Sequence, residues 1–190
     1  MNPLLQIILI LCFTNTIFSQ TDSSSIQKPS HNNIQHFLYE DSCGSPLTES
    51  DLWEVIQGKV INVKDGNTIT IVQEDRNTKE ILLAAIKLPP EGNSYRDSAK
   101  QMLNNLVMNK EINILVNPSV LHKNQEPEIN EYTGIVYVNK KEVNLILLKL
   151  GYVFYIEPKA YTISNYTNCV YQIEERKAKR AKSGLWKVLN

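Results

Sequence analysis

The sequence has no net charge and few of the residues on which common catalytic sites depend. Lysine and arginine together number 20, aspartate and glutamate also number 20, and histidine occurs 3 times. Proteins dedicated to nucleic-acid binding usually carry a basic excess, so the charge balance argues against that class. His31, His36 and His122 have no cysteine, aspartate or glutamate at metal-ligand spacing and are interpreted as surface residues. The sequence has no Gly-rich phosphate loop, which argues against a nucleotide-binding site of that kind. It also has no Ser-His-Asp order in a matching context, which argues against a serine-hydrolase triad.

The chain also lacks an apolar run long enough to form a stable transmembrane helix. The apolar block at residues 4–13 is too short to span a bilayer, and small Ser19 precedes a polar stretch that starts at Gln20. This pattern predicts a signal peptide over residues 1–19, cleaved near Ser19, and a secreted or periplasmic (extracytoplasmic) protein. Because no lysine or arginine precedes the block, an uncleaved N-terminal anchor is the alternative.

Cysteine is scarce, and the chain has only 3. Removal of the signal peptide leaves Cys43 and Cys169, and two thiols in an exported chain most simply form one disulfide. That bond would fasten the segment before the domain to the last helix. A pair of buried or free thiols is the alternative, and metal binding by two isolated cysteines is poorer still.

Composition divides the rest of the chain into three parts. Residues 20–36 are rich in serine, threonine, asparagine and glutamine and predict a disordered linker. Residues 37–56 are mixed and include Pro46 and Trp53, which favours an extension packed on the domain. Residues 57–187 alternate strand-like and helix-like patterns and form the predicted domain.

The order of predicted elements indicates the fold. The predicted strands are Lys59–Val63, Thr68–Val72, Glu80–Ile86, Glu111–Val116 and Gly134–Val138, and the predicted helices are Tyr95–Met108, Val143–Leu150 and Asn165–Lys182. Asp65-Gly66 is a strong signal for a tight turn between the first two strands. This order predicts a mainly β fold with α (α+β), a five-stranded OB-type barrel capped by about three helices.

Several motifs of the predicted domain resemble the staphylococcal nuclease family. They are Gly58–Thr68, Ile81–Glu91, Gly134–Val138, Val143-Asn144-Leu145, Leu150-Gly151-Tyr152 and Ala181–Trp186. The last is among the more specific, because a helix running into Gly-Leu-Trp closes that fold. The resemblance implies the same OB-type barrel with capping helices.

The resemblance also implies a phosphodiester-cleaving site, built from one calcium ion, two aspartates, a glutamate and two arginines. Carboxylates hold the hard cation, the glutamate positions water, and the arginines bind phosphate oxygens. The implied aspartate positions are Asn67 and Lys87, the arginine positions are Leu82 and Thr133, and the glutamate position is Pro90. An amide brings no charge to a cation, and an ammonium repels it. All five side chains thus differ from those the chemistry needs.

Shifting the alignment by one residue does not rebuild the site. It brings Glu91 to the glutamate position, but it places Leu88 at the second aspartate and Leu83 at the first arginine. Losing one such group typically costs about two or three powers of ten in rate. We therefore predict a catalytically inactive binding or interaction module, with no cofactor.

Two alternatives remain open. The first is an active, secreted, calcium-dependent nuclease of DNA or RNA with a rearranged site formed from Asp65, Asn67 and Glu91, with Arg96 or Asp97 nearby. Calcium is expected only under this alternative. The second is a structural envelope or secreted component.

The sequence leaves the partner open among nucleic acid, glycan and protein. A basic run lies within Glu174–Lys187, and five aromatic residues precede or begin the last predicted helix. Such a run contacts nucleic acid, anionic lipid or acidic glycan in some proteins, but the solvated face of a terminal helix explains it equally and is preferred. Lys87 is similarly an anion contact or, as we prefer, a solvated or salt-bridged lysine.

Overall fold

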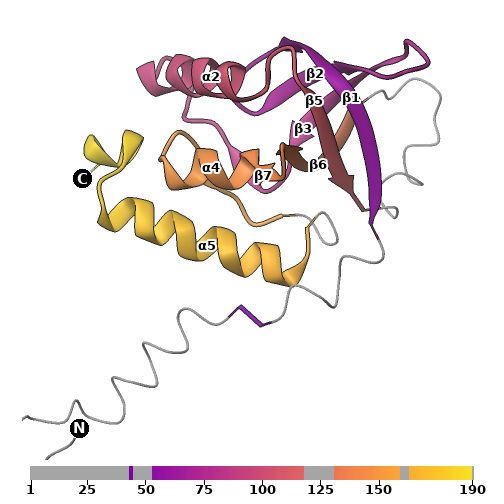
Figure 1. Ribbon diagram of the computed structural model, residues 1–190. Coiled ribbons are helices and arrows are strands. Elements are labelled where there is room, and N and C mark those ends of the chain that lie inside the picture. The colour runs from indigo at the N-terminus through magenta and orange to yellow at the C-terminus, as the bar shows by residue number, and fades with distance from the viewer. Residues whose placement is uncertain (1–42, 45–52, 118–130, 159–162, 190) are drawn as a thin grey trace, which may run out of the picture.

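In the part of the chain that the structure describes, five strands close into a β-barrel and three α-helices stack beside it (Figure 1). This computed structural model describes residues 43–44, 53–117, 131–158 and 163–189. The barrel strands are β1 (Glu54–Val63), β2 (Thr68–Val72), β3 (Thr78–Leu83), β5 (Glu111–Val116) and β6 (Glu131–Val138). The helices are α2 (Ser94–Val107), α4 (Val143–Lys149) and α5 (Asn165–Arg180), followed by the 3₁₀ turn η4 (Gly184–Lys187). The predicted α+β class and OB-type barrel are confirmed.

The barrel closes through one parallel pairing. The strand order is β3-β2-β1-β5-β6, and β3 then pairs in parallel with β6. Two short antiparallel pairings lie outside this ring: β7 (Lys141–Glu142) pairs with the end of β6, and β4 (Ile86–Lys87) pairs with β8 (Phe154–Tyr155). Along the chain, β4 lies between β3 and α2, and β8 lies between α4 and α5.

Strand β1 has different neighbours along its two halves. Glu54–Lys59 pairs with β5, whereas β2 pairs with β1 from Lys59 to Val63. A register shift between Val60 and Asn62 marks a bulge, which bends the strand around the barrel. Within the described residues, the first half of β1 therefore has a paired strand along one edge only.

The predicted boundaries of three strands were wrong. The strand predicted over Glu80–Ile86 ends at Leu83, because the chain turns at Ala84 and Ala85, where Ala85 has a φ of 57°. The N–H of Ala84 donates to the carbonyl of Gly134 at 2.8 Å, which draws the chain away from the line of the strand. The other two strands begin earlier than predicted. Strand β6 begins at Glu131 and not at Gly134. Strand β1 begins at Glu54 and not at Lys59, so three residues assigned to the N-terminal extension (54–56) belong to the barrel.

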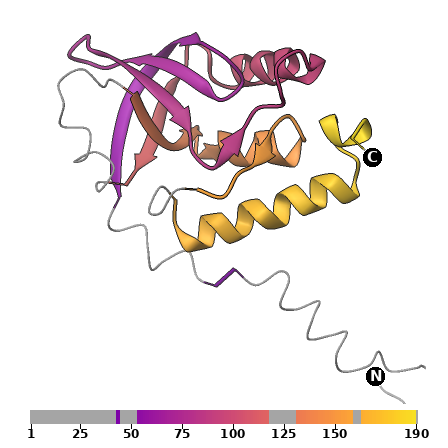
Figure 2. The ribbon, with the colours of Figure 1, turned by 180° about the vertical axis from the view of Figure 1, so that it is seen from behind.

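A single core joins the barrel to the helices. Its largest fully buried side chains are Val60, Ile69, Ile71, Ile81, Leu83, Leu103, Ile114, Ile135, Leu147, Leu148, Tyr171 and Leu185. The helix α4 lies between α2 and α5, as Figures 1 and 2 both show. Leu147 and Leu148 of α4 are fully buried, and α4 contacts α2, α5 and β6.

The ends of α4 and η4 meet at two glycines. Gly151 has a φ of 70° and Gly184 a φ of 52°, both in the left-handed region. A Cβ added to Gly151 would lie 2.3 Å from the carbonyl oxygen of Ser183. The N–H of Leu185 donates to the carbonyl of Gly151 at 2.9 Å. This close backbone approach brings together two of the motifs on which the family resemblance rests.

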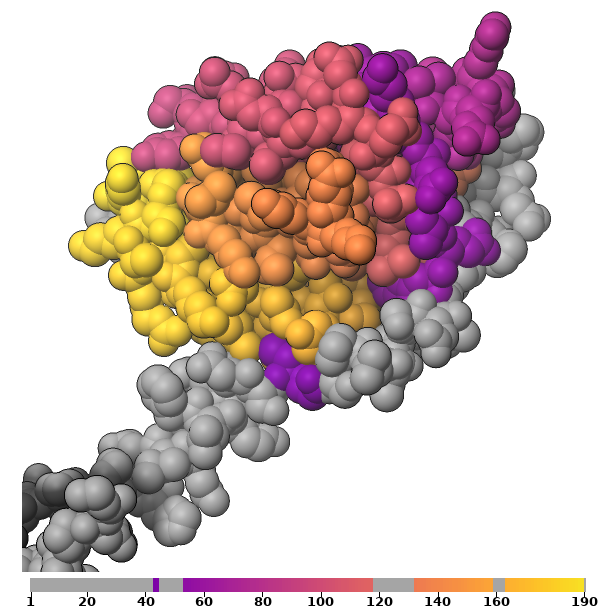
Figure 3. All heavy atoms as spheres, in the orientation of Figure 1, coloured from indigo at the N-terminus to yellow at the C-terminus, as the bar shows by residue number. Residues whose placement is uncertain are grey.

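A disulfide fastens the N-terminal region to α5. Cys43 and Cys169 are bonded, with their Cα atoms 5.5 Å apart and a sequence separation of 126, as predicted. Figure 3 shows residues 43–44 in contact with the start of α5. The predicted signal peptide (1–19), the predicted linker (20–36), most of the extension (37–56) and all three histidines lie outside the described residues. None of the helices described is long and apolar enough to cross a membrane.

Candidate functional site

The two positions implied for arginines lie side by side in the barrel wall. Leu82 of β3 is paired with Thr68 of β2 on one edge and with Thr133 of β6 on the other. Leu82 and Thr133 are half-buried, and Thr68 is buried. The structure therefore brings these positions together as the resemblance implies, but it fills them with an aliphatic chain and a hydroxyl.

Asn67, at the first implied aspartate position, is held by the main chain around it. Its N–H donates to Oδ1 of Asp65 at 2.9 Å, and its carbonyl accepts from the N–H of Leu83 at 2.8 Å. Its side-chain Nδ2 donates to the carbonyl of Ile86 at 3.4 Å, and its Oδ1 accepts from the hydroxyl of Thr68 at 3.4 Å. Asp65 thus stabilises the hairpin turn, and Asn67 joins that turn to the β3–β4 link.

Lys87, at the second implied aspartate position, lines a groove. It is exposed on β4, opposite Phe154 of β8. The groove has a volume of about 760 Å³, and we call it the Lys87 groove. Its lining residues are Lys87, Leu88, Pro89, Pro90, Glu91, Arg96, Phe154, Tyr155, Glu175, Lys179, Trp186 and Leu189. Sequence positions implied for metal and base chemistry therefore border a largely apolar and aromatic surface.

The residues of the rearranged-site alternative are only partly brought together. Glu91 and Arg96 line the Lys87 groove, whereas Asp65 belongs to the β1–β2 turn and Asp97 is not among the lining residues. Nη1 of Arg96 donates to the carbonyl of Pro89 at 2.9 Å, so the arginine supports the proline turn. The loop does not gather these acids at one point.

Two other charged residues that line the groove, Glu175 and Lys179, form an ion pair with each other. Glu175 is buried and accepts from the N–H of Tyr155 at 2.9 Å and from Nζ of Lys179 at 2.8 Å. The same Nζ lies 4.6 Å from the ring centroid of Trp186, and Phe154 contacts that ring edge-on at 5.1 Å between centroids. Lys87, by contrast, has no ion-pair partner among the described residues. Its charge is available to a ligand.

The side chains at these positions do not fit calcium. The described residues contain no group of three or more His, Cys, Asp and Glu side chains placed to hold a metal. The two implied ligand positions offer one neutral amide, already in contact with the main chain, and one ammonium. Calcium requires several oxygen ligands and favours carboxylates. We therefore assign no step of a mechanism to a metal here.

Comparison with known proteins agrees with this architecture. A family model described as "Staphylococcal nuclease homologue" matches residues 63–188. The chain belongs to the staphylococcal nuclease family. It is 25% identical over 150 residues to a "Micrococcal nuclease" of Shigella flexneri, covering 70% of this chain and 75% of that protein. It is 22% identical over 129 residues to an "Uncharacterized endonuclease" of Haemophilus influenzae, covering 67% of this chain and 65% of that protein, just under two thirds of its length.

In this staphylococcal nuclease homologue, the side chain of Asn144 joins β6 to the turn that follows β3. It is fully buried, and its Nδ2 donates to the carbonyls of Ala84 at 3.1 Å and Gly134 at 3.3 Å. Its Oδ1 accepts from the N–H of Val136 at 3.0 Å. Sequence reasoning used this asparagine only as part of a motif. The available signal was a polar residue within the apolar helix.

A second buried polar cluster, which sequence reasoning missed, joins β7 to α5. One carboxylate oxygen of Glu142 accepts a hydrogen bond from Tyr171, and the other accepts from Tyr137 at 3.3 Å. Burial raises the pKa of Glu142 above its ordinary value, although both hydrogen bonds act in the opposite direction. Burial also raises the pKa of Tyr171, and the neighbouring Glu142 adds to this rise. None of the three residues lines the Lys87 groove, so the cluster stabilises the domain and not the candidate site.

Proposed function

We propose that this protein is an exported member of the staphylococcal nuclease family that has lost phosphodiester hydrolysis and acts as a binding module. The observation that carries the proposal is the pairing of Leu82 with Thr68 and Thr133. Charge that develops on a phosphate during cleavage requires nearby donors, and neither leucine nor threonine supplies a guanidinium. Loss of a single comparable donor lowers a rate by about a hundredfold to a thousandfold, and here both positions are substituted.

The carboxylate positions support the same proposal. The side-chain amide of Asn67 donates a hydrogen bond to the carbonyl of Ile86. Lys87 places a positive charge where the family chemistry requires a negative one. The remaining acid of the β1–β2 turn, Asp65, accepts a main-chain hydrogen bond. A bound divalent cation would therefore meet repulsion without compensating charge.

A binding role is supported by the Lys87 groove. Its volume of about 760 Å³ lies within the range of ligand sites, roughly 300–1,000 Å³. Phe154, Tyr155 and Trp186 supply aromatic contact surface, and Lys87 supplies a positive charge that has no ion-pair partner among the described residues. We propose that ligand contact occurs in this groove, with nucleic acid, glycan and protein as the classes to be separated by direct binding measurements.

Export is supported by two features. The bond between Cys43 and Cys169 suits an oxidising compartment, and the apolar block at residues 4–13 precedes a predicted cleavage site at Ser19. Mass spectrometry of the protein recovered from the culture medium or periplasm should give a chain beginning at Gln20. Recovery of the full-length chain in a membrane fraction would instead support the N-terminal anchor.

An active nuclease with a rearranged site is the competing function. It is favoured by one observation, the presence of Glu91 and Arg96 in the same groove as Lys87. The names of the two bacterial relatives, a nuclease and an endonuclease, also point toward it. It requires Asp65 to leave its role in the hairpin turn and Asn67 to help bind the metal.

A cleavage assay on the mature protein separates the two functions. Single- and double-stranded DNA and RNA are incubated with calcium or with a chelator, and calcium binding is measured by calorimetry. We expect no cleavage above the buffer rate and no calcium-binding heat.

Matched variants identify the source of any activity. Asp65→Ala and Glu91→Gln test the rearranged site, and Glu157→Gln changes an exposed glutamate that does not line the groove. Calcium-dependent cleavage that disappears in the first two variants and persists in the third would refute the proposed loss of activity. Cleavage that persists in all three variants would show that Asp65 and Glu91 are not its source.

A further inference from the structure

The first half of β1 has an open edge. The N–H of Val60 donates to the carbonyl of Lys110 at 3.0 Å, and its carbonyl accepts from the N–H of Asn109 at 3.1 Å. Backbone groups of successive strand residues point to opposite edges, so those of Val55 and Gln57 face away from β5. Strand β2 pairs with β1 only from Lys59 onward. The described part of the chain therefore pairs no strand with this edge at Val55 and Gln57.

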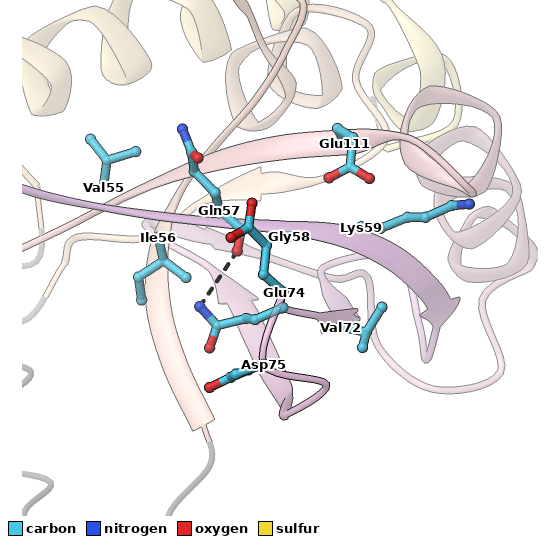
Figure 4. A pocket seen from close by; sticks show the side chains of 10 residues that line it. Val55, Ile56, Gln57, Gly58, Lys59, Val72, Glu74, Asp75 and Glu111 are labelled. Carbon is cyan, nitrogen blue, oxygen red and sulfur yellow. Dashed lines mark hydrogen bonds between the residues drawn. The ribbon is translucent and has the colours of Figure 1, made fainter.

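A side chain partly substitutes for the missing strand. Nε2 of Gln73 donates to the carbonyl of Gln57 at 3.4 Å, shown as the dashed line in Figure 4. This bond is long for an N–H···O hydrogen bond, which is usually near 2.9–3.0 Å. The N–H of Gln73 itself donates to the carbonyl of Asn77 at 2.9 Å, so the chain has already turned back into β3. A weakly held amide thus occupies a place where the N–H of an added strand would donate.

The open edge borders an acidic groove. The groove has a volume of about 640 Å³, and Figure 4 shows Glu74 and Asp75 of the β2–β3 turn and Glu111 of β5 around this stretch of β1. Lys59 is the basic residue of its lining. Val55 is 56% exposed. The surface therefore combines unpaired backbone groups, an exposed apolar side chain and an excess of negative charge.

We propose that this edge of β1 binds an extended basic segment of a partner protein as an added strand. The segment pairs with the backbone of Val55 and Gln57 and displaces the amide of Gln73. Strand addition draws its affinity from main-chain hydrogen bonds and its selectivity from alternate side chains. Lysine or arginine on one face of the segment meets Glu74 and Glu111, and apolar residues on the other face cover Ile56.

Charge argues against a second copy of this chain as the occupant. Two copies paired through this edge would bring two acidic grooves together, and like charges placed in one interface disfavour binding. A basic partner gains from the same charges. The surface shares no residue with the Lys87 groove, so the inference does not depend on the proposed function.

The probe is a fluorescently labelled nonapeptide that alternates valine with lysine. We expect saturable binding to the mature protein by fluorescence anisotropy, weakened by added salt. A peptide with glutamate in place of lysine should bind at least about tenfold more weakly, since tenfold corresponds to one or two hydrogen bonds or ion contacts. Equal binding of the two peptides, or no binding of the lysine peptide at millimolar concentration, would overturn the proposal.

Two substitutions at one position test the backbone pairing. Val55→Pro removes an N–H that faces the open edge while leaving the pairing with β5 intact, and Val55→Ala retains that N–H. We expect the proline variant to bind the lysine peptide about tenfold more weakly and the alanine variant to bind within about threefold of the unmodified protein. Similar binding by all three proteins would refute strand addition.

Amide hydrogen exchange gives a readout that needs no variant. The peptide should slow exchange at Val55 and Gln57 of the unmodified protein, because an added strand would accept hydrogen bonds from these N–H groups. Slowing confined to the Lys87 groove would place the peptide elsewhere and contradict the proposal. A concentration-dependent dimer that Val55→Pro abolishes would assign the edge to a second copy instead.

Discussion

Leu82 and Thr133 lie opposite each other in the parallel pairing that closes the barrel. The pairing places the two positions that the family resemblance implies for arginines in adjacent strands of the closed barrel. The backbone that holds these positions therefore forms without arginine side chains. This makes the site suitable for stepwise reconstruction.

Restoring the carboxylates should restore metal binding without restoring cleavage. The variant Asn67→Asp with Lys87→Asp replaces a neutral amide and a cation by two anions, which gives calcium the charge it lacks. We expect a calcium Kd of roughly 10⁻⁴–10⁻³ M by calorimetry, as in weak extracellular sites.

The variant Leu82→Arg with Thr133→Arg is the control for this reconstruction, and it should show no calcium binding. Calcium binding by the unmodified protein with the same affinity would contradict the prediction, because it would show that the present residues already hold the metal. Cleavage by the carboxylate variant alone would show that the arginines are dispensable.

Gly151→Ala should destabilise the domain more than Gly92→Ala. Both glycines have positive φ, of 70° and 80°, but a Cβ at Gly151 would lie 2.3 Å from the carbonyl oxygen of Ser183, whereas one at Gly92 meets nothing within 4 Å. The backbone cost of about 1–2 kcal/mol is common to both, and the clash at Gly151 should add about 1–3 kcal/mol. Urea unfolding followed by circular dichroism measures the difference. Equal losses would mean that α4 and η4 separate at little cost.

Removing the disulfide should lower the free energy of unfolding by about 4–5 kcal/mol. Cys43 and Cys169 close a loop with a sequence separation of 126, and the entropy gained by the unfolded chain grows with loop length. The variant Cys43→Ser with Cys169→Ser, compared with the unmodified protein by urea unfolding, measures the loss. A reductant should destabilise the unmodified protein and leave the variant unchanged; a similar effect on both would trace the loss to some other cause.

Glu142 should make stability fall as pH rises. Its carboxyl has a pKa raised by burial above the ordinary value of 4.5. Between that value and the raised pKa, the folded protein binds more protons than the unfolded chain, so the free energy of unfolding decreases with rising pH. Glu142→Gln lacks this titration. Urea unfolding from about pH 4 to pH 8 should show the unmodified protein losing stability relative to the variant. A constant difference across this range would show that the pKa is not raised.

The sequence predicted the parts of the fold that local pattern determines. The limits of Thr68–Val72 and Glu111–Val116 were correct, because β-branched or alternating residues end at turn signals. The end of β3 was missed because the turn at Ala84-Ala85 depends on a hydrogen bond to Gly134, fifty residues further along the chain. The β4–β8 pair is only two residues long on each strand, and no local pattern distinguishes it.

For the candidate site, the family motifs identified positions that lie in adjacent strands, but not the contacts that their neighbours make. Motif spacing placed Leu82 and Thr133 at positions that the structure makes adjacent. The hydrogen bond from Arg96 to Pro89 and the role of Asp65 in the hairpin turn are contacts between side chain and backbone, which residue type alone does not determine. The open edge of β1 follows from strand register, and the sequence contains no signal for it.

The positions of Cys43 and Cys169 along the chain determine when their disulfide can form during synthesis. Cys43 leaves the ribosome before every strand of the barrel, and Cys169, within α5, leaves after all of them. Domains fold largely as units, starting from the N-terminal side during synthesis. The barrel strands are thus all available before the second thiol emerges, and a chain truncated ahead of α5 keeps an unpaired thiol at Cys43. The bond can therefore close only after every barrel strand and the first part of α5 have been synthesised, so it cannot hold a partial barrel in place.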